Sequence, residues 1–319
     1  MSTPHERPHA AIEVLITEYL DQESVALLSA EFVTHYDPTL VESPDRIVAL
    51  AGGVTALVVR ARTQIRGRVL DAFDRLKMIG RLGVGLDNID VEVCAARGIE
   101  VCPATGANAV SVAEWTIAAI LVGMRNVWQA TPAVLAGRWP RNELMLSEVS
   151  GKRLGLVGFG SIARLVACRA CAFDMEVVAC GRPGAPEDPS WQALGAIAMS
   201  FEALVATSDV VSLHIPLVPS TRHLIDGQAL ARMKPTALLI NSSRGGLIDE
   251  GALRDALRAS RLRGAVLDVF ENEPLPAGSA FDVIPNLLLT PHISGVTAEA
   301  NRRVSAAVVA AVQRVMRRR

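Results

Sequence analysis

The hydrophobic positions in the first third of the chain fall into short runs that alternate with helical patterns. The runs are "AIEVLITEYL", "VTALVVRAR", "KMIGRLGVGLDNID" and "IEVCPAT". They are rich in strand-forming residues, whereas "DQESVALLSAEF" between the first two is typical of a helix. This alternation predicts an α/β unit built on a parallel sheet.

A second series of apolar runs follows, and each run is hydrophobic enough for a strand that is covered on both faces. These runs are "LGLVGFG", "MEVVACG", "VVSLHIP", "ALLINSS", "GAVLDVF" and "NLLLTPH". The order predicts a doubly wound nucleotide-binding domain over 105–289. Residues 1–104, completed by 290–319, then form a substrate-binding domain. The predicted fold class is α/β, with two Rossmann-like or flavodoxin-like domains, doubly wound parallel sheets and a cleft between the domains.

A long helical stretch spans 108–139 and is apolar over much of its circumference up to Pro132. We expect it to be buried between domains and between subunits. Its longest apolar run, Trp115 to Met124, is about half the length that a membrane-spanning helix needs. We therefore expect no membrane partner.

The charge balance and the cysteine content narrow the class of protein further. The formal net charge is −1, which gives no reason to expect a nucleic-acid partner. Five cysteines and a polar N-terminus without a signal-peptide pattern favour a cytoplasmic location. The terminal "RVMRRR" is interpreted as a solvated end, with an interaction tail as the alternative.

Cys168 and Cys171 form a CxxC motif, whose alternatives are redox chemistry or half of a zinc site. No second Cys/His pair has ligand spacing, so we expect no metal. At i and i+3 the two thiols share one face of a predicted helix. We interpret them as small hydrophobic residues packed in the core.

The run "LGLVGFGSIARLVACRA" combines a strand, a glycine-rich turn and a helix. Gly158 and Gly160 begin the pattern, and Ala163 stands in place of a third glycine. In that context the backbone N–H groups and the helix N-terminus would face a pyrophosphate. A βα turn that binds nothing is the alternative, but Ala still permits close helix-to-strand packing.

The next strand lacks the acidic residue that usually binds the adenosine ribose of NAD. It ends in Cys180 and Gly181, and Arg182 follows. A carboxylate would repel a 2'-phosphate, whereas a guanidinium beside a small residue supplies donors for it. NADP is therefore favoured, and NAD remains possible if Arg182 points to solvent.

Three short motifs follow three successive strands. They contain Arg244 in "NSSRGGLID", Asp268 and Glu273 in "LDVFENEP", and His292 in "LTPHISG". Because the carboxyl ends of parallel strands meet at one edge, these side chains can converge. They would supply a carboxylate clamp, an orienting acid and a proton carrier. Each alone could be an ordinary loop residue, but their ordered occurrence indicates a site.

With these motifs the chain resembles the D-2-hydroxyacid dehydrogenases, a family that includes phosphoglycerate dehydrogenases and glyoxylate or hydroxypyruvate reductases. "GRLGVGLDNID", "GLVGFGSIA", "HIPLVPST", "NSSRGGLIDE", "GAVLDVFENEP" and "TPHISG" carry the resemblance in order. It implies that Arg244 holds the substrate carboxylate, that His292 is the general acid and base, and that Glu273 is its partner. It also implies a homodimer with 108–139 at its centre.

The resemblance further assigns contacts to cofactor and substrate. The cofactor-binding residues would be Gly158, Gly160, Ser161, Ile162, Gly181, Arg182, Ile215, Ser242, Ser243, Asp268, Ser294 and Gly295. Val84 and Gly85 would offer backbone N–H groups to a small 2-oxo or 2-hydroxy acid across the cleft. Arg60, in "LVVRART", would bind a second acidic group of that substrate, with a solvated surface arginine as the alternative.

Several substrates stay open on this reading: glyoxylate or hydroxypyruvate, 3-phosphoglycerate, and sulfolactate. The chain ends soon after the helix that follows His292, so we expect no appended amino-acid-sensing domain. The alternative to an enzyme is a dinucleotide-sensing, corepressor-like binding protein on the same fold, because fold alone does not determine function.

Overall fold

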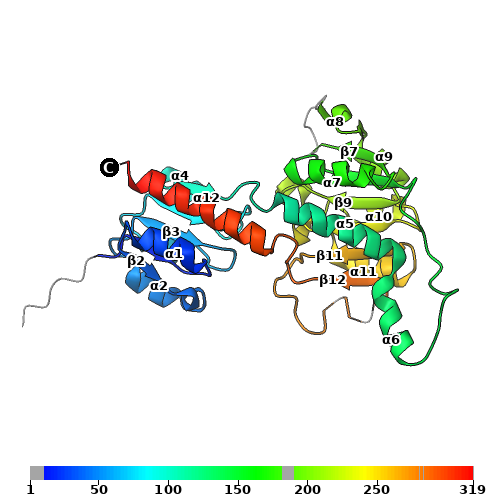
Figure 1. The fold of residues 1–319 in the computed structure, drawn as a ribbon, viewed down its shortest axis with the longest axis horizontal. Coiled ribbons are helices and arrows are strands. Elements are labelled where there is room, and N and C mark those ends of the chain that lie inside the picture. Colours follow the sequence, from blue (N-terminus) through cyan, green and yellow to red (C-terminus); the bar gives the residue numbers. More distant parts are fainter. Residues whose placement is uncertain (1–10, 182–189, 280, 283, 319) are drawn as a thin grey trace, which may run out of the picture. The chain divides into compact units, whose positions relative to one another are not determined.

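The computed structural model describes residues 11–181, 190–279, 281–282 and 284–318. The chain divides into two compact units, of which unit 1 comprises 1–108 and 296–319 and unit 2 comprises 109–295. The division falls a few residues after each of the two boundaries expected at 104 and 289. Figure 1 shows the elements of each unit.

Unit 1 contains a five-stranded parallel sheet in the order β2-β1-β3-β4-β5. This is the flavodoxin-like strand order. Its elements are β1 (Val14–Ile16), α1 (Gln22–Ser29), β2 (Thr34–Tyr36), η1 (Pro38–Glu42), α2 (Pro44–Leu50), β3 (Ala56–Val59), α3 (Gly67–Asp71), β4 (Met78–Arg81), α4 (Val91–Ala96), β5 (Glu100–Pro103) and α12 (Ala298–Met316).

Helices cover both faces of the unit 1 sheet. One buried cluster joins the strands to Leu28 of α1 and to Val304, Val308 and Val312 of α12. The opposite cluster includes residues from α2, α3 and α4. With both faces covered, β3 is buried at all four positions, which explains its unbroken apolar sequence "ALVV".

Unit 2 contains a seven-stranded parallel sheet in the order β12-β11-β10-β9-β6-β7-β8. This is the doubly wound order of dinucleotide-binding domains, extended by one strand. Its elements are α5 (Ala109–Arg125), η2 (Val127–Gln129), α6 (Ala130–Leu135), β6 (Arg153–Val157), α7 (Ser161–Cys171), β7 (Glu176–Cys180), α8 (Ser190–Ala193), β8 (Ala196–Ala198), α9 (Phe201–Thr207), β9 (Val210–Leu213), η3 (Pro219–Thr221), α10 (Gly227–Arg232), β10 (Leu238–Asn241), η4 (Gly245–Leu247), α11 (Glu250–Arg258), β11 (Gly264–Leu267) and β12 (Leu287–Leu289).

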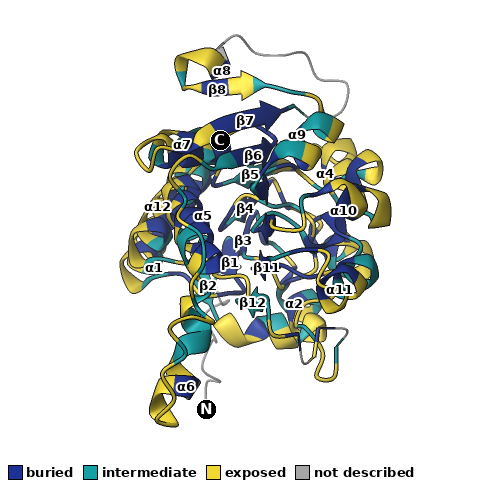
Figure 2. Cartoon of the chain, turned by 90° about the vertical axis from the view of Figure 1, so that its right-hand side faces the viewer, coloured by how far each residue is buried: buried dark blue, intermediate teal, exposed yellow. Residues whose placement is uncertain are grey.

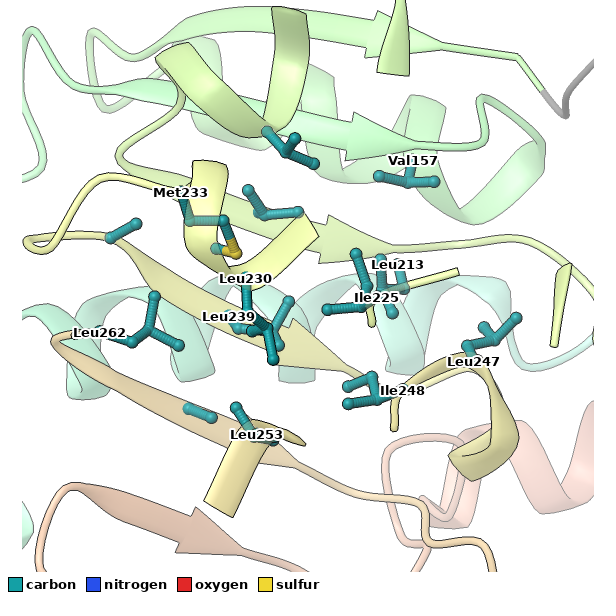
Figure 3. Packing of buried hydrophobic residues seen from close by; sticks show 14 of the residues in the cluster. Val157, Leu213, Ile225, Leu230, Met233, Leu239, Leu247, Ile248, Leu253 and Leu262 are labelled. Atoms are coloured by element: carbon teal, nitrogen blue, oxygen red, sulfur yellow. The ribbon is translucent and has the colours of Figure 1, made fainter. Parts of the chain in front are cut away.

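Successive residues of the central strands enter two separate cores. Leu213, Leu239 and Leu267 point into the core under α9, α10 and α11, part of which Figure 3 shows. Their neighbours Ile240 and Val266 point into the other core, under α5 and α7. The side-chain period of two therefore gives each strand two buried faces. The strand order reverses between β6 and β9, which is the position where doubly wound sheets bind their ligands.

The prediction that Cys168 and Cys171 pack in the core is wrong. Both are exposed on α7. The helix buries its small residues at i, i+3, i+4 and i+7, namely Ala163, Val166, Ala167 and Ala170. The two cysteines do share a face, but it is the solvent face, because Ala fits the close approach to the sheet better. Among the described residues no His, Cys, Asp or Glu side chains are grouped as metal ligands would be.

The segment after α5 exposes an unusual amount of apolar surface. Leu135 is 83% exposed, Trp139 75% and Met145 80%, and α6 is mostly exposed in Figure 2. Within the described residues no single helix has the length and hydropathy to cross a bilayer, although α5 and the following 127–135 segment, bent by 60°, pass that test as a pair.

Candidate active site

The glycine-rich turn between β6 and α7 forms an open cradle. Gly158 has φ +91°, and a Cβ there would lie 2.5 Å from the carbonyl oxygen of His214, so only glycine fits. Gly160 is the N-cap of α7, and a Cβ on it would meet nothing within 4 Å. No side-chain cap hydrogen bond closes the start of α7, and the space beside Gly160 is open, as binding of an anion by the first N–H groups of a helix requires.

Polar groups continue along the same edge of the sheet. Ile215 is almost fully buried beneath Gly158, and its carbonyl accepts a hydrogen bond from Ser243 Oγ at 2.7 Å. Ser242 Oγ is buried and has no hydrogen-bond partner among the described residues. A buried hydroxyl without a partner is costly unless a ligand binds it. The cradle and this hydroxyl fit a dinucleotide that lies along the edge.

The strand that leads to the expected ribose end of this edge does not end in an acidic residue. β7 ends at Cys180, and burial raises the pKa of its thiol to about 11, so the thiol stays neutral. Gly181 follows and is partly exposed. Arg182 lies outside the described residues, so the prediction that it binds a 2'-phosphate stays a prediction.

His292 and Glu273 form a direct pair. His292 Nδ1 lies 2.7 Å from Glu273 Oε2, while Glu273 Oε1 accepts the backbone N–H of Phe270 at 3.0 Å. Both side chains are partly exposed, at 44% and 36%. The pair brings together residues from the loops that follow β11 and β12.

The protonation of Glu273 determines which imidazole nitrogen can react. Burial raises the pKa of this carboxyl, but the bonds from His292 and Phe270, together with the charges of His292 and Arg244, outweigh burial and hold the pKa below its usual range. At neutral pH the carboxylate is thus ionised and only accepts hydrogen bonds. Nδ1 must donate, which leaves Nε2 as the ring nitrogen that can exchange a proton with a bound molecule. The pair is lost only as the pH falls through that lowered pKa.

Asp268 positions the loop that carries His292. It is fully buried, and its carboxylate accepts bonds from Thr290 Oγ1 and from the backbone N–H groups of Ile293 and Ser294, at 2.6 to 2.8 Å. The backbone N–H of His292 donates to the Asp268 carbonyl. These bonds hold His292 at its φ of +55°. Asp268 therefore acts on the loop that contains His292, Ser294 and Gly295.

Asn241, which the sequence analysis did not single out, braces the turn that carries Arg244. Its side-chain amide donates to the Arg244 carbonyl at 2.8 Å, and its side-chain oxygen accepts the Ser243 N–H at 3.0 Å. Asn241 is fully buried at the last position of β10. A polar residue at the carboxyl end of an otherwise apolar strand was the signal that could have identified it.

Arg60 lies at the carboxyl edge of the unit 1 sheet. Its guanidinium donates to Asn301 Oδ1 at 2.6 Å and lies 5.9 Å from the ring centroid of Tyr19. The buried carboxylate of Glu18 accepts the backbone N–H groups of Arg60 and Thr63, both at 2.9 Å. Hydrogen bonds to Glu18 and Asn301 thus hold Arg60 in place, in contrast to a solvated surface arginine. Glu18, two residues after the apolar strand β1, was not identified from the sequence either.

Two further candidates lie on the loop after β4. Val84 is 41% exposed, and Gly85 is partly exposed.

The predicted pyrophosphate contacts lie at the start of α7. Ser161 is exposed there, and Ile162 beside it is half-buried. These positions are accessible to small molecules, as their predicted contacts through backbone N–H groups require.

Comparisons with known proteins agree with this architecture. Residues 117–294 match the family model described as D-isomer specific 2-hydroxyacid dehydrogenase, NAD binding domain. An (S)-sulfolactate dehydrogenase of Chromohalobacter salexigens is 48% identical over 304 residues, which cover 95% of this chain and 98% of that protein. The chain therefore belongs to the D-isomer specific 2-hydroxyacid dehydrogenase family, whose members are oxidoreductases.

Solved structures with the same fold include enzymes that use two different forms of the cofactor. A D-lactate dehydrogenase from Aquifex aeolicus complexed with NAD and lactic acid matches with a TM-score of 0.85 and 27% identity, covering 96% of both chains. An NADPH-dependent glyoxylate/hydroxypyruvate reductase from Sinorhizobium meliloti matches with a TM-score of 0.81 and 29% identity, covering 93% of this chain and 92% of that one. A nicotinamide dinucleotide is thus the cofactor of the family, and the edge described above fits it.

The Glu273→Gln variant tests the importance of the carboxylate. A neutral amide cannot stabilise an imidazolium, and a lost charge-assisted hydrogen bond of about 1.5 to 3 kcal/mol corresponds to roughly a 10- to 100-fold fall in kcat for reduction. Steady-state rates of reduction at neutral pH measure this fall. An unchanged kcat would show that Glu273 does not act through His292.

Proposed function

We propose that this chain interconverts a D-2-hydroxy acid and the corresponding 2-oxo acid, with His292 as acid and base, Glu273 as its partner and Arg244 as the carboxylate clamp. The observation that supports these roles is the His292–Glu273 pair at 2.7 Å, with the charge of Arg244 acting on the same carboxylate. The three residues follow three adjacent strands at one sheet edge.

Each side chain has a distinct task in this proposal. The planar guanidinium of Arg244 binds the substrate carboxylate through two N–H groups and polarises the keto oxygen. When bound, the nicotinamide dinucleotide supplies a hydride for reduction or accepts one in oxidation. His292 Nε2 gives a proton to the developing alkoxide oxygen and takes it back in the reverse direction. Glu273 stabilises the positive charge of the imidazolium meanwhile.

We further propose that the substrate carries a second acidic group, and we favour a sulfonate over a phosphate. Arg60 would bind that group, and Val84 and Gly85 would donate backbone N–H groups to the carboxylate. The relative at 48% identity is named an (S)-sulfolactate dehydrogenase. The (S) descriptor agrees with D-specificity. In the priority rules for stereocentres, the carbon that bears the sulfonate ranks above the carboxylate carbon. The (S) form thus has the spatial arrangement of a D-2-hydroxy acid.

NADP is the favoured cofactor in this proposal, and NAD is the alternative. A partly exposed glycine and a neutral thiol end the strand where an acid would repel a 2'-phosphate. Arg182 directly after them supplies a matching cation.

We also propose that the active form is a homodimer in the cytoplasm. Leu135, Trp139 and Met145 are largely exposed in the segment after α5, and an exposed apolar surface of this kind supports association with a second copy of the chain. All five cysteines are free, as expected in a reducing compartment. Light scattering should give about twice the 34.0 kDa chain mass, and a monomer mass would contradict the dimer.

A substrate panel tests the enzymatic proposal. Oxidation of NADPH or NADH is followed with sulfopyruvate, phosphohydroxypyruvate, hydroxypyruvate and glyoxylate. We expect turnover, with the lowest KM for an acid that has a second anionic group. In the His292→Ala variant kcat should fall by about 10² to 10⁴, while dinucleotide affinity stays within about twofold.

Two outcomes would contradict this proposal. Tight dinucleotide binding without turnover of any panel acid would favour the dinucleotide-sensing alternative. If Arg60→Met raised KM equally for glyoxylate and for sulfopyruvate, or left both unchanged, Arg60 would not bind a second acidic group.

The Arg182→Ala variant tests cofactor preference. Loss of a charge-assisted hydrogen bond should raise KM for NADPH by about 10-fold or more and leave KM for NADH nearly unchanged. Equal effects on the two cofactors would place Arg182 away from the 2'-phosphate.

A further inference from the structure

A second imidazole–carboxylate pair lies beside the first. His223 Nε2 is 2.6 Å from Glu271 Oε1, and both side chains are partly exposed, at 35% and 27%. Glu271 precedes Glu273 by two residues in the same loop. The backbone N–H of Glu271 donates to Glu250 Oε1 at 2.7 Å. The loop that carries the partner of His292 is therefore held at Glu271 from two sides.

The backbone of His223 is joined to the loop that carries Arg244. The His223 N–H donates to the Gly246 carbonyl at 2.8 Å, and the Ile225 N–H donates to the Leu247 carbonyl at 3.0 Å. Ile225 and Ile248 form a parallel bridge. One residue thus contacts both loops: its main chain binds the turn after Arg244, and its ring binds the loop of Glu273.

The two loops also touch each other directly. A Cβ on Gly245 would lie 1.9 Å from the carbonyl carbon of Phe270, so no side chain fits between them. The N–H of Phe270 in turn donates to Glu273. A shift of either loop therefore changes the separation of Arg244 from the Glu273–His292 pair.

Electrostatic repulsion gives this bridge a physical reason. Glu250, Glu271 and Glu273 are close enough that burial and the other two carboxylates raise the pKa of Glu250. His223 contacts Glu271, and His292 contacts Glu273, on which the charge of Arg244 also acts. Each of these two neighbouring carboxylates thus has its own imidazole partner.

We propose that His223 is a positioning residue that holds Arg244 and the Glu273–His292 pair in register through Glu271. The inference rests on the proposed function, because it assumes that those three residues perform the reaction. It predicts that changes at His223 affect the chemical step more than cofactor binding, since the bridge lies at the loops of Arg244 and Glu273 and not at the glycine cradle.

The test compares His223→Asn with His223→Gln. His223 has φ +50°, a region that Asn tolerates, so His223→Asn keeps the backbone but is too short to reach Glu271. The longer Gln side chain can donate to Glu271 again. We expect kcat for a panel acid to fall about 10-fold or more in His223→Asn, dinucleotide affinity to change less than twofold, and His223→Gln to recover most of the loss. Gln228→Ala, at an exposed position on α10, is the control.

A double-variant comparison separates this inference from the proposed function. Melting temperatures are measured for His223→Asn, Glu271→Gln and both together, which needs no substrate. If the pair exists, the double variant loses no more than the larger single loss. Additive losses would overturn the bridge even in an active enzyme. Equal losses of kcat and dinucleotide affinity, or no rescue by Gln, would overturn the positioning role. A wild type that turns over no panel acid would instead refute the proposed function.

Discussion

The parallel pairing of β10, β11 and β12 is the constraint on which the candidate active site depends. In parallel strands the backbone hydrogen bonds fix the register, so the three carboxyl ends emerge at neighbouring points of one edge. Arg244, Glu273 and His292 follow those ends. Their separation is therefore set by the spacing of strands in a buried sheet. A few hydrogen bonds are then enough to fix the loops that carry them.

The groups that hold these loops are mostly buried and polar, and the cost of removing them from water must be offset by hydrogen bonds. Asp268 is fully buried, and three donors from the His292 loop satisfy its carboxylate. Bonds to a charged group contribute about 1.5 to 3 kcal/mol each, which is comparable to the cost of leaving such a group unsatisfied. The loop is thus held where the donors reach Asp268, because any other position would leave a charge without partners. Asn241, which is uncharged, holds the turn of Arg244 through its own hydrogen bonds in the same way.

The sequence allowed prediction of the sheets and of the residues that follow strand ends, because apolar runs and glycine patterns are local signals. The hydrogen bonds that hold the loops could not be predicted in the same way. Whether Glu18 binds the amides near Arg60, or His223 binds Glu271, depends on which loops become neighbours in the sheet. The error at Cys168 and Cys171 has a related cause: spacing shows which residues share a helix face, but not which face meets the sheet.

The two ends of the dinucleotide-binding edge differ in how strongly they are determined. At the reactive end, loops that touch without room for a side chain connect Arg244 to Glu273, and the bonds of Glu273 and Asp268 extend the connection to His292. At the ribose end, the described residues stop at a neutral thiol and a glycine. A single charge–phosphate contact of the kind proposed for Arg182 would contribute about 1.5 to 3 kcal/mol. The choice between NAD and NADP can therefore change with one or two residues, whereas the chemistry cannot change without refitting several buried partners at once.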